Sequence, residues 1–224
     1  MATAVPSASI HCLLDKDSFL RGLGELVRRD RNLSEVVERY GPPPLWVREP
    51  GFATLVYIIL EQQVSLASAR AAYERLLQAA RPLTPARFLR LTDAELKGIG
   101  FSRQKTAYAR LLAESIQKRR LNLRSLHRLG DDAAREKLLA LKGIGPWTAD
   151  IYLLSALRRP DIWPVGDLAL ATAVQEVTHL RKRPSRERLE KMSEPWRPWR
   201  AVAARLFWHH YLSKRGQRTA SISL

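Results

Sequence analysis

Asp167 is an aspartate at a position where a carboxylate could act on a bound substrate. It ends the segment Pro164-Val165-Gly166-Asp167 and precedes a run of apolar and small residues, Leu168 to Val174, that predicts a helix. In most proteins an aspartate directly before a helix is an N-cap. Beside a reacting centre, the same carboxylate stabilises positive charge that develops in a transition state. Both interpretations are open from these residues alone.

A repeated pentapeptide indicates a second kind of chemistry, the binding of phosphate. Leu96-Lys97-Gly98-Ile99-Gly100 recurs as Leu141-Lys142-Gly143-Ile144-Gly145, and each copy is expected to end one helix and precede another. Two glycines one residue apart permit positive φ and leave the backbone N–H groups bare, so that a phosphate can approach them and the start of the next helix. An ordinary helical hairpin with a glycine cap is an equally good interpretation of one copy. The second copy is more specific, because Pro146 suits the first turn of a following helix. The phosphate-binding residues expected there are Lys142, Gly143, Ile144, Gly145 and Thr148.

The whole chain carries a large excess of positive charge. Its 38 Lys and Arg residues against 22 Asp and Glu residues give a formal net charge of +16 and a sequence pI near 10.7. Such an excess favours a polyanionic partner, because phosphates that a protein neutralises release their counterions. Ribosomal-type and other basic proteins carry similar charge without any enzymatic activity. The charge therefore indicates contact with nucleic acid and leaves the chemistry open.

Length and cysteine content limit the fold and the location. A chain of 224 residues that is 46% hydrophobic can form one large domain or two closely packed lobes. Cys12 is the only cysteine, which excludes a disulfide framework and an iron–sulfur site and favours a reducing intracellular location. The longest apolar stretch, Phe52 to Leu60, has about half of the length that a bilayer requires. We expect no membrane contact, and a cytoplasmic location in a prokaryote or a nuclear one in a eukaryote.

Most of the sequence predicts helix, because apolar residues recur at spacings of three and four and β-branched alternation is rare. Ser65 and Thr92 are expected N-caps, and Thr92 with Glu95 fits a capping box. Breaks are expected at the proline-containing segments 41–44 and 158–166. The predicted helices are 16–29, 50–61, 65–79, 92–97, 102–117, 132–141, 147–157, 168–178, 185–192 and 198–213.

Taken together, these motifs resemble the helix–hairpin–helix DNA glycosylase superfamily, and within it the 3-methyladenine DNA glycosylase II family. The resemblance is carried by the segment from Leu141 to Ala149, followed after a short loop by Pro164-Val165-Gly166-Asp167-Leu168. The segments Ile59-Leu60-Glu61-Gln62-Gln63-Val64-Ser65 and Trp196-Arg197-Pro198-Trp199-Arg200 are also similar to stretches of that family. The resemblance covers about residues 50–213. It implies an all-α, two-lobed fold in one domain, 1–224, with an active cleft between the lobes. One lobe would be about 51–158, with the hairpin at 141–149, and the other about 1–50 plus 159–224.

The function that this resemblance implies is base excision repair of alkylated DNA. The enzyme would flip a base such as 3-methyladenine or 7-methylguanine out of the duplex and hydrolyse its N-glycosidic bond. Asp167 matches the catalytic aspartate of the superfamily, which stabilises oxocarbenium-like charge on the sugar and orients water. Superfamily members with lyase activity carry a lysine at the position of Trp147. An indole cannot form a Schiff base, so a monofunctional enzyme is expected.

The resemblance also implies residues for the base pocket and for the duplex. Trp147 and Trp208 match positions at the base pocket, and Tyr57 is a weaker match. An indole face would attract a cationic alkylated base by about 0.5–2 kcal/mol, although core packing is the usual role of these residue types. Gln63 matches the wedge residue that fills the gap left by the flipped base, with an ordinary polar turn residue as the alternative. At Ile151 and Leu168 some relatives have tyrosines, which leaves the range of lesions open.

Metal ions and cofactors have little support in the sequence. His209 and His210 are adjacent and diverge on a helix, with no cysteine or acidic partner at ligand spacing, so no metal site is expected from side chains. No organic cofactor is implied. Hairpins of this family can hold a monovalent cation through backbone carbonyls, which would here be those of Gly143 and Gly145. The partner expected is double-stranded DNA that contains alkylated bases, bound by a monomer, with Arg103 and Lys105 on the DNA-facing side.

Several alternatives stay open. Asp150 and Asp161 are rival carboxylates, the first inside a predicted helix and the second in a proline-containing loop. A non-catalytic, structure-specific DNA-binding protein could use the same hairpins, although such a protein has no need of the combination of Trp147 and Asp167. An oxidised-base glycosylase with lyase activity is disfavoured by Trp147 and by the absence of an iron–sulfur cysteine set.

Overall fold

In the computed structural model, which describes residues 13–216, the chain folds into helices joined by turns, and these residues contain no β-strand. The prediction of an all-α fold is confirmed. Residues 1–12, with Cys12, and residues 217–224 lie outside the described part of the chain. Within that part, no helix has the length and the apolar character needed to cross a membrane.

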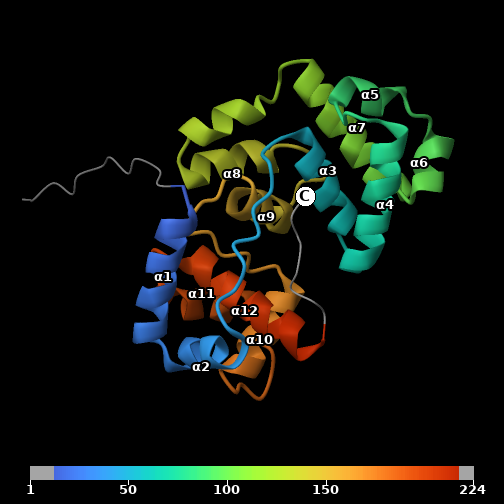
Figure 1. Cartoon of the computed structure of the whole chain (residues 1–224). Helices are drawn as coiled ribbons and strands as arrows, with labels where there is room; N and C mark the ends of the chain where they lie inside the picture. Colours follow the sequence, from blue (N-terminus) through green and yellow to red (C-terminus); the bar gives the residue numbers. More distant parts are fainter. Residues whose placement is uncertain (1–12, 217–224) are drawn as a thin grey trace, which may run out of the picture.

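One group of helices is built around α12 (Arg200–Lys214), which packs on three others: α1 (Lys16–Arg29), α2 (Arg31–Tyr40) and α10 (Leu168–Val177). Asp30 both ends α1 and caps α2 with its side chain, so a single residue makes the corner between these two helices. Figure 1 shows this group in the lower half of the molecule, together with α11 (Arg186–Ser193). The short 3-10 helix η2 (Glu194–Trp196) follows α11.

The second group is built around α3 (Phe52–Glu61), which packs on α4 (Leu66–Ala79), α7 (Arg103–Gln117) and α9 (Pro146–Ser155). Nine of the ten residues of α3 are buried, as expected for a helix that is apolar on all sides. The remaining elements are α5 (Pro85–Arg90), α6 (Asp93–Ile99), the 3-10 helix η1 (Leu123–Arg128) and α8 (Asp131–Leu139).

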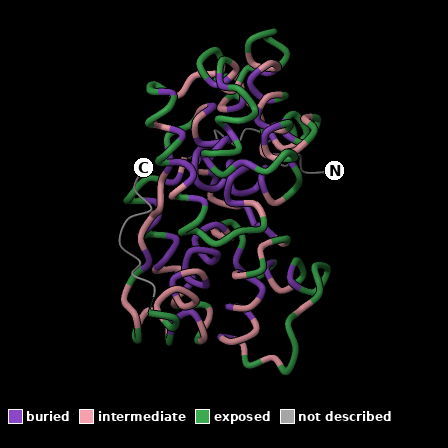
Figure 2. The backbone as a smooth tube through the Cα atoms, turned by 90° about the vertical axis from the view of Figure 1, so that its right-hand side faces the viewer, coloured by how far each residue is buried: buried purple, intermediate pink, exposed green. Residues whose placement is uncertain are grey.

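Residues 41–51 carry the chain from α2 to α3 along the junction of the two groups (Figure 1). The segment is anchored by Arg205 of α12, which is fully buried and donates to the carbonyls of Leu45 at 2.6 Å and Leu154 at 3.1 Å. The backbone N–H of Arg48 also donates to the carbonyl of Ser155 at 3.0 Å. Because a buried guanidinium must have its donors satisfied, these bonds tie the linker, α9 and α12 together. Figure 2 shows buried segments through the interior and exposed ones at the periphery.

The ten predicted helices agree with the structure to within two residues at each end. Ser65 caps α4, and Thr92 and Glu95 form a capping box at the start of α6, as predicted. The structure adds α2 and α5, which the sequence analysis missed. Only Asp30 separates α2 from α1, and α5 is six residues long, so neither has the flanking turn or the length that marks a helix in a sequence.

Candidate active site

Asp167 lies at the N-terminus of α10. Its Oδ1 accepts a hydrogen bond from the backbone N–H of Leu170 at 2.7 Å, so Asp167 is the N-cap of the helix. The turn before it is closed by the N–H of Asp167, which donates to the carbonyl of Pro164 at 2.9 Å. Asp167 is partly exposed, and Leu168 beside it is 64% exposed. The carboxylate is therefore fixed by the start of the helix and is still accessible.

Two tryptophans from different helices also bind this carboxylate. Trp147 on α9 donates its indole N–H to Oδ2 of Asp167 at 2.8 Å, and Trp208 on α12 donates to Oδ1 at 3.1 Å. Among residues 13–216, no lysine, arginine or histidine forms an ion pair with Asp167. Neutral N–H donors orient a carboxylate without cancelling its charge. The negative charge of Asp167 therefore remains available to a cationic group placed next to it.

The rival carboxylate Asp150 has a different environment. It is fully buried in α9 and forms an ion pair with Arg135 of α8. Burial raises the pKa of Asp150 to about 6, although Arg135 opposes this shift. Its Oδ2 is buried without a hydrogen-bond partner. Asp150 thus joins the two helices of the hairpin and has no access to a substrate.

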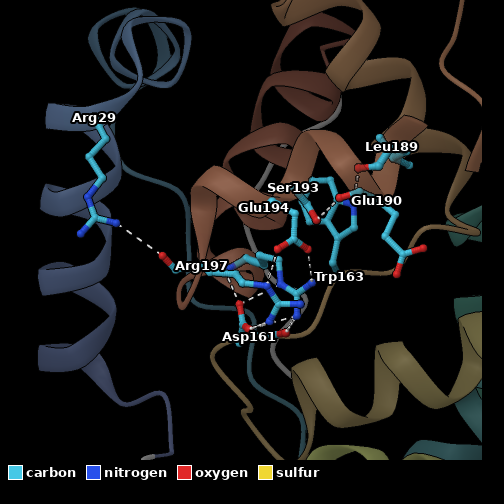
Figure 3. A network of polar contacts seen from close by, with 9 residues as sticks. Arg29, Asp161, Trp163, Leu189, Glu190, Ser193, Glu194 and Arg197 are labelled. Carbon is cyan, nitrogen blue, oxygen red and sulfur yellow. Dashed lines mark hydrogen bonds and ion pairs between the residues drawn. The ribbon is translucent and has the colours of Figure 1, made fainter. Parts of the chain in front are cut away.

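The other rival, Asp161, lies in the loop between α9 and α10 and is part of a network of ion pairs (Figure 3). Arg200 donates to both of its carboxylate oxygens, at 2.8 and 3.0 Å, and Arg197 donates at 2.6 Å. Arg197 also binds Glu194 and, through its carbonyl, Arg29 of α1. These contacts neutralise Asp161 and give it a structural role in joining the loop to α12.

The second copy of the repeat forms the turn between α8 and α9. Gly143 has φ +98°, and a Cβ at this position would overlap the ring of Tyr108 on α7, so only glycine fits. Gly145 is the N-cap of α9 and Pro146 is its first residue, as the sequence predicts. Lys142 and Gly145 are exposed, and Ile144 is buried beneath them. This is the geometry of a bare hairpin that leads into a helix N-terminus.

The first copy has a different conformation, although its five residues are identical. Residues 96–99 belong to α6, so Gly98 is a helical residue with open space around it. Gly100 alone takes a positive φ, +115°, and it packs against Arg75 of α4. Arg75 in turn donates to the carbonyl of Ile99 at 2.8 Å. Both copies end one helix and precede another, as predicted, but only the second copy lies wholly between two helices, at residues 141–145.

A hollow of about 750 Å³ separates the hairpin from the α3–α4 loop and the start of α7. Gln63 lies in that loop, exposed and with a positive φ of 56°. Val64 and Leu66 beside it are 46% and 48% exposed. An exposed glutamine followed by exposed apolar residues suits contact with DNA bases, and the role of Gln63 as a wedge stays a prediction. The residues that line the hollow include no acidic residue; they are Gln62, Gln63, Val64, Ser102, Gln104, Lys105, Tyr108, Leu139, Leu141, Lys142, Gly143, Ile144 and Gly145.

Tyr57 packs against Tyr73 and Arg48. Its ring lies 4.6 Å from that of Tyr73, and the guanidinium of Arg48 lies 4.8 Å from its centroid. The side chain is 5% exposed. These contacts indicate packing between α3 and α4, and contact of Tyr57 with a flipped base stays a prediction.

The two basic residues expected on the DNA-facing side, Arg103 and Lys105, differ in their surroundings. Arg103 is exposed at the start of α7. Lys105 is half-buried and donates its Nζ to the carbonyl of Leu60 at 2.7 Å, and burial lowers its pKa. Arg103 is free to contact a phosphate, whereas Lys105 is engaged with the end of α3.

The two carbonyls predicted to hold a cation each accept a hydrogen bond, and a cation there stays a prediction. The carbonyl of Gly143 accepts from Gln62 at 3.0 Å, and that of Gly145 accepts from the N–H of Ala149 at 3.0 Å. Both oxygens thus face N–H donors. No group of three or more His, Cys, Asp or Glu side chains suited to a metal occurs within residues 13–216.

Two residues that contact the hairpin were given no role by the sequence analysis. Gln62 donates its amide to the carbonyl of Gly143 at 3.0 Å and to Oγ1 of Thr148 at 2.9 Å, and Tyr108 fills the space above Gly143. Thr148 is consequently buried, and its side chain is occupied by Gln62. Neither partner could be found from spacing, because Gln62 and Tyr108 lie far from the hairpin in sequence.

The chain is similar to known proteins over most of its length. Residues 56–198 match the family described as HhH-GPD superfamily base excision DNA repair protein. The DNA-3-methyladenine glycosylase of Bacillus subtilis is 25% identical over 212 residues, which cover 89% of this chain and 70% of that protein. The chain spans 64% of the length of another Bacillus subtilis relative, at 26% identity over 185 residues.

Solved structures show the same fold. The DNA-3-methyladenine glycosidase of Bacillus halodurans has a TM-score of 0.72 and 28% identity, over 88% of this chain and 92% of that one. The Schizosaccharomyces pombe 3-methyladenine DNA glycosylase Mag1, solved in complex with abasic DNA, has a TM-score of 0.75 and 24% identity, over 87% and 97%. The family model covers the α3–α4 loop, the hairpin and Asp167, which confirms the resemblance drawn from the motifs. The chain belongs to the HhH-GPD superfamily of base excision DNA repair proteins.

Proposed function

We propose that this protein is a monofunctional DNA glycosylase that releases alkylated bases such as 3-methyladenine and 7-methylguanine from double-stranded DNA. The observation that carries the proposal is the carboxylate of Asp167, held between the indole N–H groups of Trp147 and Trp208 and without a cationic partner among the described residues. The relatives named DNA-3-methyladenine glycosylase support the class of substrate. A monomer inside the cell, acting on chromosomal DNA, is part of the same proposal.

The proposed chemistry needs one carboxylate and a water molecule. As the bond between C1′ and the base nitrogen lengthens, positive charge builds on the sugar, and the carboxylate of Asp167 stabilises it. The electron pair of the broken bond stays with the base, which leaves as a neutral molecule because alkylation had made it cationic. Water then adds its oxygen to C1′ and gives up a proton, with Asp167 as the proposed acceptor. The product is an abasic site in an intact strand.

The position of Trp147 bears on the reaction type. Its indole N–H is occupied by Asp167, and it has no amine to attack C1′. The face of the ring can still contact a flipped base, and cation–π attraction of about 0.5–2 kcal/mol would favour a cationic base over a normal one. Trp208 is placed in the same way on the other oxygen of Asp167.

The proposal is tested by measuring base release from DNA treated with a methylating agent, with the wild type and Asp167→Asn in parallel. Asparagine can still cap α10 but lacks the negative charge, so that folding and DNA binding are expected to survive while release is lost. Release of methylated purines by the wild type alone, leaving uncut abasic DNA, supports the proposal. Equal release by Asp167→Asn refutes the assignment of Asp167, and a covalent adduct trapped by borohydride refutes the monofunctional mechanism. Binding without release from any alkylated DNA supports the alternative, a non-catalytic DNA-binding protein.

A further inference from the structure

We propose that Gln62 is a positioning residue that locks the hairpin to the α3–α4 loop, so that the segment that grips the DNA backbone and the segment that carries Gln63 bind the duplex as one unit. The inference rests on the proposed function, since it assigns a task within the same DNA-binding surface. It concerns a residue that touches neither the reacting sugar nor Asp167.

The first observation is the pair of hydrogen bonds that Gln62 makes across the hollow. Its Nε2 donates to the carbonyl of Gly143 at 3.0 Å and to Oγ1 of Thr148 at 2.9 Å. One acceptor lies in the turn of the hairpin and the other in the first turn of α9. Thr148 is 2% exposed, so loss of the amide would leave its oxygen buried and short of a donor. A single side chain therefore ties both parts of the hairpin to the end of α3.

The second observation is that the end of α3 is itself held rigidly. The side chain of Lys105 binds the carbonyl of Leu60 at 2.7 Å. Arg48 binds both carboxylate oxygens of Glu61, at 2.6 and 2.8 Å, and these two side chains are 7% and 4% exposed. Gln62 thus extends from a fixed point. A displacement of the hairpin would be transmitted through it to the α3–α4 loop.

The third observation concerns Gln63, the residue that follows Gln62. Gln63 is a non-glycine residue in the left-handed region, with φ +56°, a conformation that persists only where the surroundings impose it. Its own side chain is exposed, so the constraint comes from Gln62 on one side and from the start of α4 on the other. Holding Gln62 in place therefore also sets the direction in which Gln63 projects.

The hairpin is held from its other side as well. Tyr108 packs on Gly143 so closely that a Cβ there would overlap its ring, and Gln104 donates to the hydroxyl of Tyr108 at 2.7 Å. Tyr108 restrains the position of the turn, but it does not hydrogen-bond the carbonyl of Gly143 in this arrangement. The polar link between the hairpin and the α3–α4 loop is made by Gln62.

The test uses Gln62→Met in the full chain, because methionine keeps the length and the volume of the side chain and removes the amide donor. Loss of two hydrogen bonds that hold the binding surface is expected to raise the Kd for a duplex with a tetrahydrofuran abasic analogue by roughly tenfold. In a second duplex, which carries 2-aminopurine as the base to be flipped, the rise in fluorescence on protein binding is expected to be smaller for this variant. Gln175→Met is the matched control, since its amide donates to a carbonyl at 3.4 Å at the remote end of α10 and its loss is expected to leave both readouts unchanged.

A double-mutant cycle separates positioning from a general loss of folding. If Thr148→Val weakens binding and the double variant with Gln62→Met binds no worse than Gln62→Met alone, the two residues act through their mutual contact. Unchanged affinity of Gln62→Met overturns the proposal, as does full additivity of the two losses. These readouts do not involve base release. If the wild type binds the abasic duplex but releases no methylated base, the glycosylase proposal fails while the role of Gln62 is still decided.

Discussion

The indole N–H of Trp147 donates to Oδ2 of Asp167 at 2.8 Å, so that the same ring orients the carboxylate and presents its faces beside it. Oδ1 has two donors, Trp208 at 3.1 Å and the backbone N–H of Leu170 at 2.7 Å, whereas Oδ2 is held by Trp147. The orientation of the carboxylate therefore depends on Trp147 more than on Trp208. This asymmetry yields a prediction for each residue.

Trp147→Phe keeps an aromatic face and removes the donor to Asp167. Since hydrogen bonds to charged groups contribute about 1.5–3 kcal/mol, we expect kcat/KM for release of methylated purines to fall by roughly 10- to 100-fold. Trp208→Phe is expected to reduce kcat/KM less, because the backbone N–H of Leu170 still binds Oδ1 of Asp167. Trp163→Phe serves as the control, since its indole N–H donates to the carbonyl of Leu189, away from Asp167, and only stability should change. Equal rates for wild type and Trp147→Phe in single-turnover assays would show that this bond does not contribute to catalysis.

Asp150 makes stability depend on pH in the direction opposite to that of most carboxylates. Burial raises its pKa to about 6, so the folded protein binds more protons than the unfolded chain between about pH 4 and 6, and stability falls as the pH rises through this window. The free energy of unfolding of wild type minus that of Asp150→Asn should decrease by on the order of 2–3 kcal/mol from pH 4 to pH 6.5. Urea unfolding of both proteins at several pH values measures this difference. A difference that is constant, or that grows with pH, contradicts the prediction.

Glu176 of α10 is expected to show the opposite sign. Burial alone would raise its pKa. Hydrogen bonds from His210, Lys214 and Arg215, at the C-terminal end of α12, lower the pKa of Glu176 to about 2. Its contribution to stability is complete above the unfolded value of 4.5 and is lost as the pH falls from there towards 2. Glu176→Gln should therefore be less stable than wild type by about 1–2 kcal/mol at pH 7, after allowance for solvent screening, and the difference should disappear near pH 2. Glu74→Gln, which removes an exposed pair, should show little effect at either pH.

Elements that depend on a short stretch of sequence could be predicted. Contacts between segments that are distant in the sequence could not. The hairpin and the segment that ends at Asp167 are each short and lie close together in the sequence, so both could be named from spacing and residue type. The bond from Trp208 to Asp167 depends on how α12 packs on α10, and the bonds of Gln62 depend on how α3 packs on α9. The order of residues along the chain does not specify these packings.

The two copies of the pentapeptide show that five identical residues do not by themselves fix the backbone conformation. The capping box of Thr92 and Glu95 starts α6 at Asp93, three residues before Leu96, and the helix then continues through Gly98. In the second copy, α8 has already ended at Leu139, and Pro146 starts a new helix directly after Gly145. Identical residues therefore take different conformations because their neighbours place the helix end differently.

This difference leads to a paired prediction for the matching glycines. Gly98→Ala adds a methyl group in open space within a helix and should stabilise the protein by about 0.5–1 kcal/mol, with DNA binding unchanged. Gly143→Ala requires a Cβ at φ +98° and against the ring of Tyr108, so it should destabilise the protein by roughly 2 kcal/mol or more and weaken DNA binding as the hairpin shifts. Thermal unfolding and the affinity for an abasic duplex measure both effects. Similar behaviour of the two variants would contradict the structural difference between the copies, because steric strain at Gly143 has no counterpart at Gly98.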